Sequence, residues 1–378
     1  MAKRTQDYRA ELRGNGTSTS PVHKPVRWLS SGSTVLNMAC TGKPDGAFPS
    51  GSYVLFIGDS DSGKTFICLT CFAEAANNPE FDDYQLIYDA PEGGALMDIA
   101  KFFGSKTAAR LRAPAYDADG LPVHSRTAES FYYHLDEVLK KGPAIYILDS
   151  QDSLSSEAEE KKFGKDKRIF QRGEKKGPPA VGEENGETKT GSFGDGKAKV
   201  HSQKLRAAVQ NLQKTQSILI IINQSRDSFD MFNPSTFSGG RALKFYATFQ
   251  LWSSQGGVLK KVVRGKEREL GILAKVRIKK NRAVGRKRAV VIPIYHTAGL
   301  DEVGSCVDYL VAERVWKKPE GSAKITVTGL GPELVLDRES LVEHIENHNL
   351  EDELRELVTS TWMEIEAACV VDRKSRYE

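Results

Sequence analysis

The sequence lacks any long apolar run. Its strongest one, Ile218-Leu-Ile-Ile-Ile222, is far shorter than the roughly 20 residues that a membrane-spanning helix needs. The first nine residues are polar and contain no apolar core of a secretory signal. The five cysteines are an odd number at scattered positions, which does not suit a disulfide framework. We therefore expect a protein that is neither secreted nor inserted in a membrane, and that works in a cytoplasm-like compartment.

The most informative feature that is present runs from Gly58 to Thr65 and matches the pattern G-x-x-x-x-G-K-[ST]. An apolar run at 53–57 precedes it, and a stretch without Pro or Gly follows, so we predict a strand, a loop and a helix in that order. Glycines let backbone N–H groups approach phosphates, the lysine reaches the β- and γ-oxygens, and the last hydroxyl can bind Mg²⁺. The sequence thus predicts a nucleoside-triphosphate site made of Gly58, Asp59, Ser60, Asp61, Ser62, Gly63, Lys64 and Thr65.

Apolar runs and helical stretches alternate along the chain past residue 30. Runs that are apolar throughout are typical of strands covered on both faces, so we predict an α/β fold: a mostly parallel twisted sheet flanked by helices, plus a small α/β C-terminal domain. The expected strands cover 53–57, 85–88, 144–148, 217–222, 247–252, 271–278 and 289–294, the last three as an antiparallel extension. The expected helices include 128–140, 202–214, 338–348 and 350–368.

Three parts follow from changes in composition. Residues 1–30 are expected to form a flexible N-terminal arm or oligomerisation segment, residues 31–298 the core, and residues 299–378 the small C-terminal domain. Within the core, residues 155–200 are rich in Gly, Glu and Lys, and we predict a mobile loop there because no packed core is available.

Polar residues follow several of the predicted strands. The carboxyl edge of a parallel sheet is where ligand-facing residues gather, so Asp149 is a candidate for the Mg²⁺ side of the site. Glu92, after the strand that ends near Asp89, is the candidate general base; the alternative is a solvated loop carboxylate. Gln224 ends another strand and could contact a γ-phosphate through its neutral amide.

Two segments suit a polyanion. Residues 260–288 hold thirteen Lys and Arg against Glu267 and Glu269, a local net charge of +11, although a solvated hairpin face would look the same. The segment 225–240 sets large side chains among turn-forming residues: Arg226, Phe229, Met231, Phe232 and Phe237. These side chains are suited to stacking against bases, or alternatively to packing on the sheet or on a neighbouring subunit.

Taken in order, the motifs of this chain resemble those of the RecA recombinase family, over residues 31–358. The motifs that carry the resemblance are Ser31-Gly-Ser, the phosphate loop, Tyr88-Asp-Ala-Pro-Glu92, Leu148-Asp-Ser150, Ile222-Asn-Gln224, Met231-Phe232, Gly239-Gly-Arg-Ala-Leu-Lys-Phe-Tyr-Ala247, Lys279-Lys-Asn-Arg282 and Gly299-Leu-Asp-Glu-Val-Gly-Ser. The pattern looks closest to bacteriophage homologues, which implies the cytoplasm of a bacterial or phage-infected cell. Departures are Pro91, inserted before Glu92, the acidic Asp59 and Asp61, and the long segment 155–200.

The resemblance implies a DNA-dependent ATPase that uses ATP and Mg²⁺, the metal held by Thr65 and Asp149. Glu92 would activate the attacking water and Gln224 would sense the γ-phosphate. The segments 155–200 and 225–240 would be two DNA-binding loops, and the implied DNA-binding residues are Arg226, Met231, Phe232, Gly239 and Gly240. Lys280 and Arg282 would reach the ATP site of the next subunit.

The implied partners are single-stranded and double-stranded DNA, further copies of the chain in a helical filament, and single-strand-binding and loader proteins. The expected function is homologous pairing and strand exchange in recombination and repair. A DnaB-type hexameric helicase or a regulatory ATPase remains an alternative, because fold alone does not separate these functions.

Overall fold

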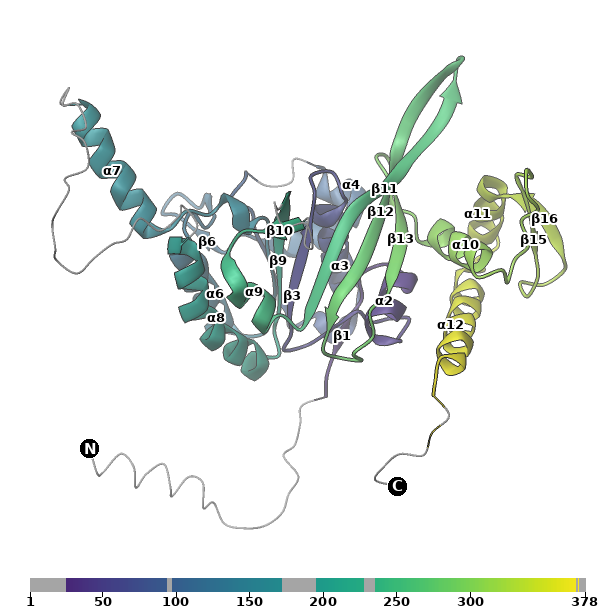
Figure 1. The fold of residues 1–378 in the computed structure, drawn as a ribbon, viewed down its shortest axis with the longest axis horizontal. Coiled ribbons are helices and arrows are strands. Elements are labelled where there is room, and N and C mark those ends of the chain that lie inside the picture. The colour runs from purple at the N-terminus through teal and green to yellow at the C-terminus, as the bar shows by residue number, and fades with distance from the viewer. Residues whose placement is uncertain (1–24, 94–96, 172–194, 228–234, 372, 374–378) are drawn as a thin grey trace, which may run out of the picture.

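The computed structural model describes residues 25–93, 97–171, 195–227, 235–371 and 373 (Figure 1). Its central feature is a sheet in the order β14-β13-β12-β11-β3-β9-β8-β4-β5, with β10 attached to β9. The strands are β3 (Tyr53–Gly58), β4 (Gln85–Asp89), β5 (Leu111–Arg112), β8 (Ala144–Leu148), β9 (Ile218–Asp227), β10 (Ser235–Phe237), β11 (Phe249–Val263), β12 (Lys266–Asn281), β13 (Ala289–Tyr295) and β14 (Gly299–Leu300). From β11 to β5 all neighbours are parallel, and β12, β13 and β14 are antiparallel additions.

The α/β class and the parallel core are thereby confirmed. One detail of the prediction was wrong, since β11 pairs parallel to β3 and the antiparallel extension begins only at β12. β3 and β8 are buried at every position, as expected for strands with both faces covered.

Helices cover both faces of the sheet. They are α2 (Thr34–Thr41), α3 (Lys64–Asn77), α4 (Ile99–Phe103), α5 (Ser105–Arg110), α6 (Ala128–Lys141), α7 (Glu157–Gln171), α8 (Asp195–Thr215), α9 (Gly240–Tyr246), α10 (Glu302–Ala312), α11 (Arg338–Asn347) and α12 (Glu351–Ala368), with single 3₁₀ turns η1 (Pro79–Phe81) and η2 (Gln151–Ser153). Helices α2, α3, α10, α11 and α12 contribute to one apolar core, and α6, α8 and α9 to the core on the other face. No described helix has the length and apolar character to cross a membrane.

The segment 155–200 differs from the prediction at its two ends. Helix α7 begins directly after this segment starts, and α8 already runs from Asp195, so both ends are helical rather than loop. Residues 172–194 lie outside the described part, as does most of the predicted N-terminal segment 1–30. Within the described end of that segment, β1 (Trp28–Leu29) pairs with β2 (Phe48–Pro49).

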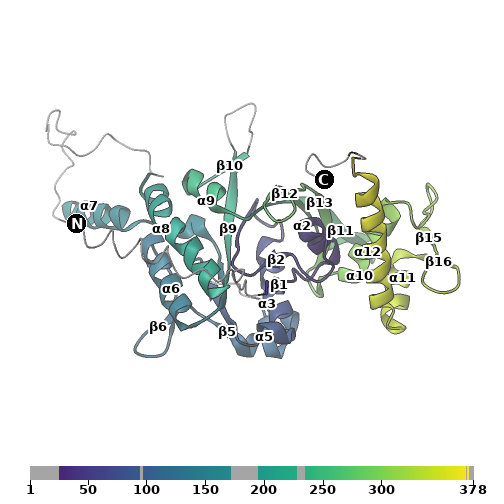
Figure 2. The same ribbon diagram turned by 90° about the horizontal axis from the view of Figure 1, so that it is seen from below.

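The C-terminal part packs against the core. Figure 2 shows α10, α11 and α12 at the opposite end of the molecule from α6 and α8. Leu341, Ile345 and Trp362 of this part belong to the same apolar cluster as α2 and α3. In this part β15 (Lys324–Val327) pairs antiparallel with β16 (Leu334–Asp337). A second small hairpin, in the core, pairs β6 (Ala115–Tyr116) with β7 (Pro122–Val123).

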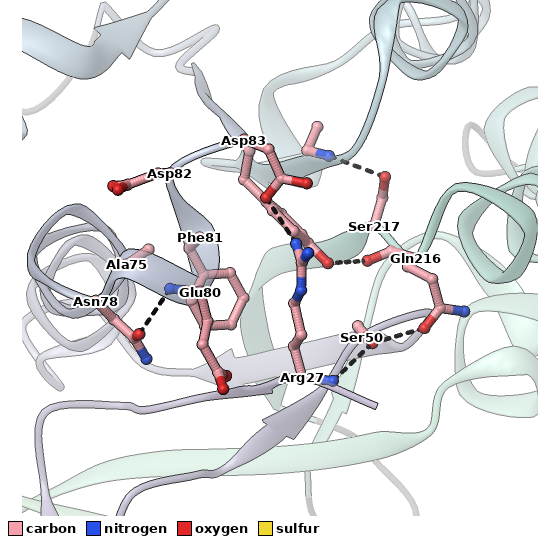
Figure 3. A network of polar contacts seen from close by, with 12 residues as sticks. Arg27, Ser50, Ala75, Asn78, Glu80, Phe81, Asp82, Asp83, Gln216 and Ser217 are labelled. Atoms are coloured by element: carbon pink, nitrogen blue, oxygen red, sulfur yellow. Dashed lines mark hydrogen bonds and ion pairs between the residues drawn. The ribbon is translucent and has the colours of Figure 1, made fainter. Parts of the chain in front are cut away.

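A polar network closes the amino edge of the sheet (Figure 3). Arg27 Nη1 lies 2.6 Å from Asp83 Oδ1, and its guanidinium lies over the Tyr84 ring. Tyr84 Oη donates to Gln216 O over 2.7 Å, and Ser50 Oγ donates to Gln216 Oε1 over 2.8 Å. These contacts join the residues that flank β1 and β2, the start of β4 and the turn before β9, so the opposite, carboxyl edge is the one left for ligands.

The hairpin of β11 and β12 extends far beyond the sheet (Figure 1). β11 pairs with β3 only as far as Ser253, and β12 pairs with β13 only from Gly271 to Arg277. Residues 259–270, which we call the arm, therefore pair only with each other or with the residues at the base of the arm. Arg264 and Gly265 turn the arm with φ of 53° and 74°, the left-handed values that a two-residue hairpin loop needs.

Candidate nucleotide and nucleic-acid site

The phosphate loop lies between β3 and α3, as predicted. At Gly58 a Cβ atom would stand 2.2 Å from the carbonyl oxygen of Ser253 on β11, so only glycine fits beside that strand. Gly63 precedes α3 with a φ of +81°, and its Cβ would stand 2.6 Å from Ile294 Cδ1. Close packing on the backbone requires glycine at Gly58, and the left-handed φ favours it at Gly63. The loop ends at a helix N-terminus, which favours an anion.

Lys64 is folded back onto its own loop. Its Nζ donates to Asp59 O over 2.5 Å and lies 3.4 Å from Ser62 Oγ. Burial lowers the pKa of Lys64, and the nearby carboxylates of Asp149 and Asp59 oppose that shift. A buried ammonium held only by neutral oxygens is ready to exchange these for phosphate oxygens.

Thr65 and Asp149 form the predicted metal side of the site. Thr65 Oγ1 donates to Asp149 Oδ2 over 2.7 Å, and Tyr88 Oη donates to the same oxygen over 2.9 Å. Burial raises the pKa of Asp149, while these two hydrogen bonds partly counter it. One hydroxyl and one carboxylate at hydrogen-bond distance fit Mg²⁺, which usually takes few protein ligands together with water and phosphate oxygens. The part of the chain that the structure describes contains no cluster of three or more His, Cys, Asp or Glu side chains of the kind that holds a metal by itself.

Glu92 lies beside this pair despite the inserted Pro91. Ser150 Oγ donates to Glu92 Oε1 over 2.6 Å, and Ser153 Oγ donates to the same oxygen. Its negative charge contributes to raising the pKa of Asp149, which follows from their proximity. Asp89, in contrast, is fully buried and accepts from Ser125 and Tyr146, so it supports the strand and does not face the ligand edge.

A pocket of about 460 Å³ opens over the phosphate loop. Its lining residues are Asp61, Ser62, Gly63, Lys64, Thr65, Phe66, Met97, Gln255, Glu269, Ile272, Ile294 and His296. Phe66, Met97 and Ile272 make apolar walls, and Gln255 and Glu269 come from the β11–β12 hairpin. A cavity of mixed lining, with apolar walls on one part and a phosphate-binding loop on another, suits a nucleotide with an aromatic base.

The end of β9 lies against the same loop. The backbone N–H of Gln224 donates to Asp152 Oδ2 over 2.6 Å, and the Gln224 side chain is exposed. Ser225 Oγ donates to Asp59 Oδ1, so the residue after Gln224 touches the phosphate loop directly. A displacement of Asp59 would therefore act directly, through this hydrogen bond, on the segment that begins at Ser225.

A buried polar network behind Gln224 had no signal in the sequence. Gln151 Oε1 accepts from Asn223 Nδ2 and from Ser238 Oγ, each over 3.1 Å, and Gln151 Nε2 lies 3.2 Å from His201 Nε2. The amide nitrogen therefore donates to His201, whose other nitrogen lies 2.8 Å from Tyr132 Oη. Burial lowers the pKa of His201 to about 4, so the imidazole is neutral. The network joins η2, the end of β9, the return of the segment 225–240 and helix α8.

The predicted DNA-contacting residues are only partly described. Met231 and Phe232 lie outside the described residues, and Arg226 is placed in β9 only by its backbone. Gly239 has a φ of +95°, and its Cβ would stand 2.4 Å from Leu243 Cδ1; at Gly240 a Cβ would stand 2.9 Å from Ala198 Cβ. These glycines thus fit the start of α9 closely, and a DNA contact at either stays a prediction.

A second hollow of about 220 Å³ lies beside Ser225 on the other face of β11 and β12. It is lined by Asp59, Ser225, Trp252, Ser253, Ser254, Lys275, Arg277 and Lys279. Lys279 Nζ lies 3.4 Å from the centre of the Trp252 ring, and burial with two neighbouring cations, Arg277 and Lys244, lowers the pKa of Lys279. An aromatic ring among three cations is suited to a nucleic-acid strand.

Within their own chain Lys280 and Arg282 hydrogen-bond to the backbone of helix α9. Lys280 Nζ donates to Lys244 O over 2.7 Å and to Phe245 O over 2.8 Å, and Arg282 Nη2 donates to Phe245 O over 2.7 Å. They thus hold the C-terminal end of α9, which packs on the face of the sheet opposite α3. Burial and the charge of Arg282 lower the pKa of Lys280 to about 8.

A strand, a phosphate loop and a helix at the carboxyl edge of a parallel sheet define a P-loop nucleotide-binding protein. Comparison with known proteins shows what the chain is similar to. A family model described as the RecA N-terminal domain matches residues 179–301. Protein RecA of Rippkaea orientalis is 28% identical over 290 residues, which cover 75% of this chain and 69% of the relative. Protein RecA of Rhodopirellula baltica is 26% identical over 336 residues, or 87% and 76% of the two chains, and that of Staphylococcus aureus is 27% identical over 293 residues, or 76% and 70%. The chain is thus similar to RecA proteins over three quarters or more of its length, which supports the RecA family.

Proposed function

We propose that this protein is a RecA-type recombinase, an ATPase that assembles on single-stranded DNA and pairs it with a homologous duplex. The observation that supports this most directly is the contact of Ser225 with Asp59. It joins the phosphate loop to the first residue of the segment 225–240, the segment that would bind DNA. Nucleotide binding at Asp59 and DNA binding at the segment after Ser225 would then affect each other through this hydrogen bond.

In the proposed reaction Lys64 leaves Asp59 O and binds the β- and γ-phosphates. Bound Mg²⁺ would neutralise charge that develops on the phosphates, and Thr65 with Asp149 would hold it. Glu92, held by Ser150 and Ser153, takes the proton of the attacking water. The exposed amide of Gln224 is free to contact the γ-phosphate.

A subunit interface would complete the site. Lys280 and Arg282 hold backbone carbonyls on the far face of the sheet from α3, so any role at a phosphate must be at the ATP site of another copy. This supports a head-to-tail assembly, which forms an open helix where the rotation does not close.

Electron microscopy of the full chain with ATP and single-stranded DNA tests the proposal. Helical filaments that need both ligands are expected. Closed hexamers would favour the helicase alternative, and the absence of any DNA-dependent assembly would favour a regulatory ATPase.

Mixed filaments test the shared site. Lys280→Ala and Lys64→Ala chains are each expected to be nearly inactive, because a basic group supplied by a neighbour is worth about 10³-fold or more in rate. In an equal random mixture about one quarter of interfaces join an intact phosphate loop to an intact basic pair, so about a quarter of the DNA-stimulated ATPase should return. A mixture as inactive as its components, in filaments that contain both, would exclude the shared site.

A further inference from the structure

The inserted Pro91 is part of a tight turn that directly follows β4. Gly93 N donates to Ala90 O over 3.0 Å, which closes a β-turn. Pro91 takes the second position of this turn and Glu92 the third. The second position of the common β-turns has a φ near −60°, the value that the proline ring fixes. Gly93 ends the turn with a φ of +98°, which favours glycine. The insertion thus builds a defined turn that carries the candidate base.

The ring of His124 holds this turn at its first residue. Ala90 is buried, and its backbone N–H donates to His124 Nδ1 over 3.1 Å. A buried N–H needs an acceptor, and the next residue, Pro91, has no N–H of its own to offer. His124 lies directly after β7, so the contact ties the start of the turn to the link between β7 and α6.

The same contact decides the tautomer of His124. Nδ1 must present a lone pair to the N–H of Ala90, so the proton of the neutral imidazole is on Nε2. Asp89 Oδ1 also lies 3.5 Å from Nδ1, but a proton on Nδ1 would leave the N–H of Ala90 against another N–H. Asp89 does not need that proton, because Ser125 and Tyr146 already donate to its carboxylate.

A buried polar cluster keeps His124 in place. The next residue, Ser125, is fully buried and donates to Asp89 from its N–H over 2.9 Å and from its Oγ over 2.5 Å. Tyr146 Oη of β8 donates to Asp89 Oδ2 over 2.6 Å. Ser125 Oγ also lies 2.9 Å from His134 Nδ1 of α6. Because these contacts join β4, β8 and α6, they fix the point at which the imidazole of His124 meets the turn.

Glu92 is therefore held through its side chain and through its backbone. Ser150 and Ser153 donate to its carboxylate, and His124 anchors the turn that carries it. A general base must lie within hydrogen-bond reach of the proton that it takes. A displacement of about 1 Å in a reacting group can cost about 10²-fold in rate, so the backbone anchor matters as much as the two serines.

We propose that His124 is a positioning residue for ATP hydrolysis: its Nδ1 anchors Ala90 and thereby places the carboxylate of Glu92 for the attacking water. His124 is not among the residues that line the pocket over the phosphate loop, so it acts on turnover and not on nucleotide affinity. The inference rests on the proposed function, because it gives His124 a role that is exerted through Glu92.

Three substitutions of His124 test this role. Asparagine places its side-chain oxygen near the position of Nδ1 and can accept from Ala90 N, whereas glutamine places its amide near Nε2 and leucine accepts nothing. We expect His124→Gln and His124→Leu to lower kcat by up to about 10²-fold, and His124→Asn to recover most of the rate. Affinity for a non-hydrolysable ATP analogue, measured by calorimetry, should stay within a few-fold in all three. The control is His348→Leu, at an exposed histidine of the C-terminal part, which should change neither quantity.

Combination with Glu92→Gln distinguishes positioning from general damage. If His124 acts through Glu92, His124→Leu should lower kcat no further in the Glu92→Gln chain. A full additional loss there would overturn the proposal, as would wild-type kcat in all three single variants or an equal loss in the asparagine and leucine variants. Thermal melting is recorded for each variant, and if His124→Leu does not fold, the comparison of asparagine with glutamine decides. The proposed function fails separately if the wild type does not hydrolyse ATP with single-stranded DNA, or if Glu92→Gln keeps the full rate.

Discussion

Replacement of Gln151 by leucine should separate the DNA response from basal ATP turnover. Gln151 is fully buried, and its amide is the central member of the network behind Gln224. Leucine has a similar volume but makes no hydrogen bond, so the change removes polar contacts with little change in packing. Because Asp152, the next residue, accepts from Gln224 N, the loss should loosen the end of β9.

The expected loss of stability follows from the hydrogen-bond partners that remain after the substitution. Asn223 Nδ2 keeps Ser238 O at 3.0 Å, and Ser238 Oγ keeps Asp152 Oδ1 at 2.5 Å, so each of these losses costs about 1 kcal/mol. His201 Nε2 is left without a partner in a buried site, which costs about 1–3 kcal/mol. The free energy of unfolding should therefore fall by about 3–5 kcal/mol.

Urea denaturation measures the stability, and ATPase is measured with and without single-stranded DNA. We expect basal turnover close to the wild type and a large loss of stimulation, because the phosphate loop does not touch Gln151. The matched control is Gln210→Leu on the exposed side of α8, which should change neither quantity. Wild-type stability and stimulation in the Gln151→Leu protein would refute the role of the network.

Three further outcomes are expected. Burial lowers the pKa of His201 to about 4, against about 6.5 in an unfolded chain. Its contribution to stability is therefore intact above about pH 6.5 and is lost as the pH falls towards 4, at about 1.4 kcal/mol per pH unit. The free energy of unfolding, measured by denaturation at pH 7 and pH 5, should differ less for His201→Gln than for the wild type. Lys64→Ala should abolish ATP hydrolysis with cooperative melting retained, and a steady-state assay with near-normal turnover would contradict the assignment. Glu92→Gln should reduce the rate constant of hydrolysis by about 10²–10⁴-fold while nucleotide affinity, measured by calorimetry, stays within a few-fold; a loss of affinity alone would assign Glu92 to binding.

The sequence was sufficient for the core because its signals are local. The run before Gly58 and the pattern through Thr65 fix a strand, a loop and a helix without reference to the rest of the chain. The carboxyl edge could also be predicted, since parallel strands end at one edge wherever their order falls. Asp149 beside Thr65 follows from that rule alone.

The buried network and the charge of the arm were not predictable in this way. Gln151 and His201 lie 50 positions apart, and an isolated glutamine and histidine on amphipathic elements give no sign that they meet. The net charge of 260–288 can be read from the sequence, but which of its side chains share a face of the β11–β12 hairpin depends on β-bulges. Register shifts between Gln255 and Gly257 and between Leu259 and Lys260 decide which alternate residues share a side.

The hairpin of β11 and β12 ties the two ligands to one rigid element. Its base contributes Ser253, whose Oγ donates to Ser62 O in the phosphate loop over 2.5 Å, and Gln255, which lines the nucleotide pocket. The reverse face carries Trp252 beside Ser225, where a DNA strand would enter. β11 hydrogen-bonds to β3 up to Gly58, at the start of the phosphate loop. Because adjacent residues of β11 face the nucleotide and the DNA, a shift of the phosphate loop on nucleotide binding should displace the part of β11 that DNA would contact. Coupling through this strand and coupling through Gln151 are independent routes, so loss of one should leave part of the DNA response.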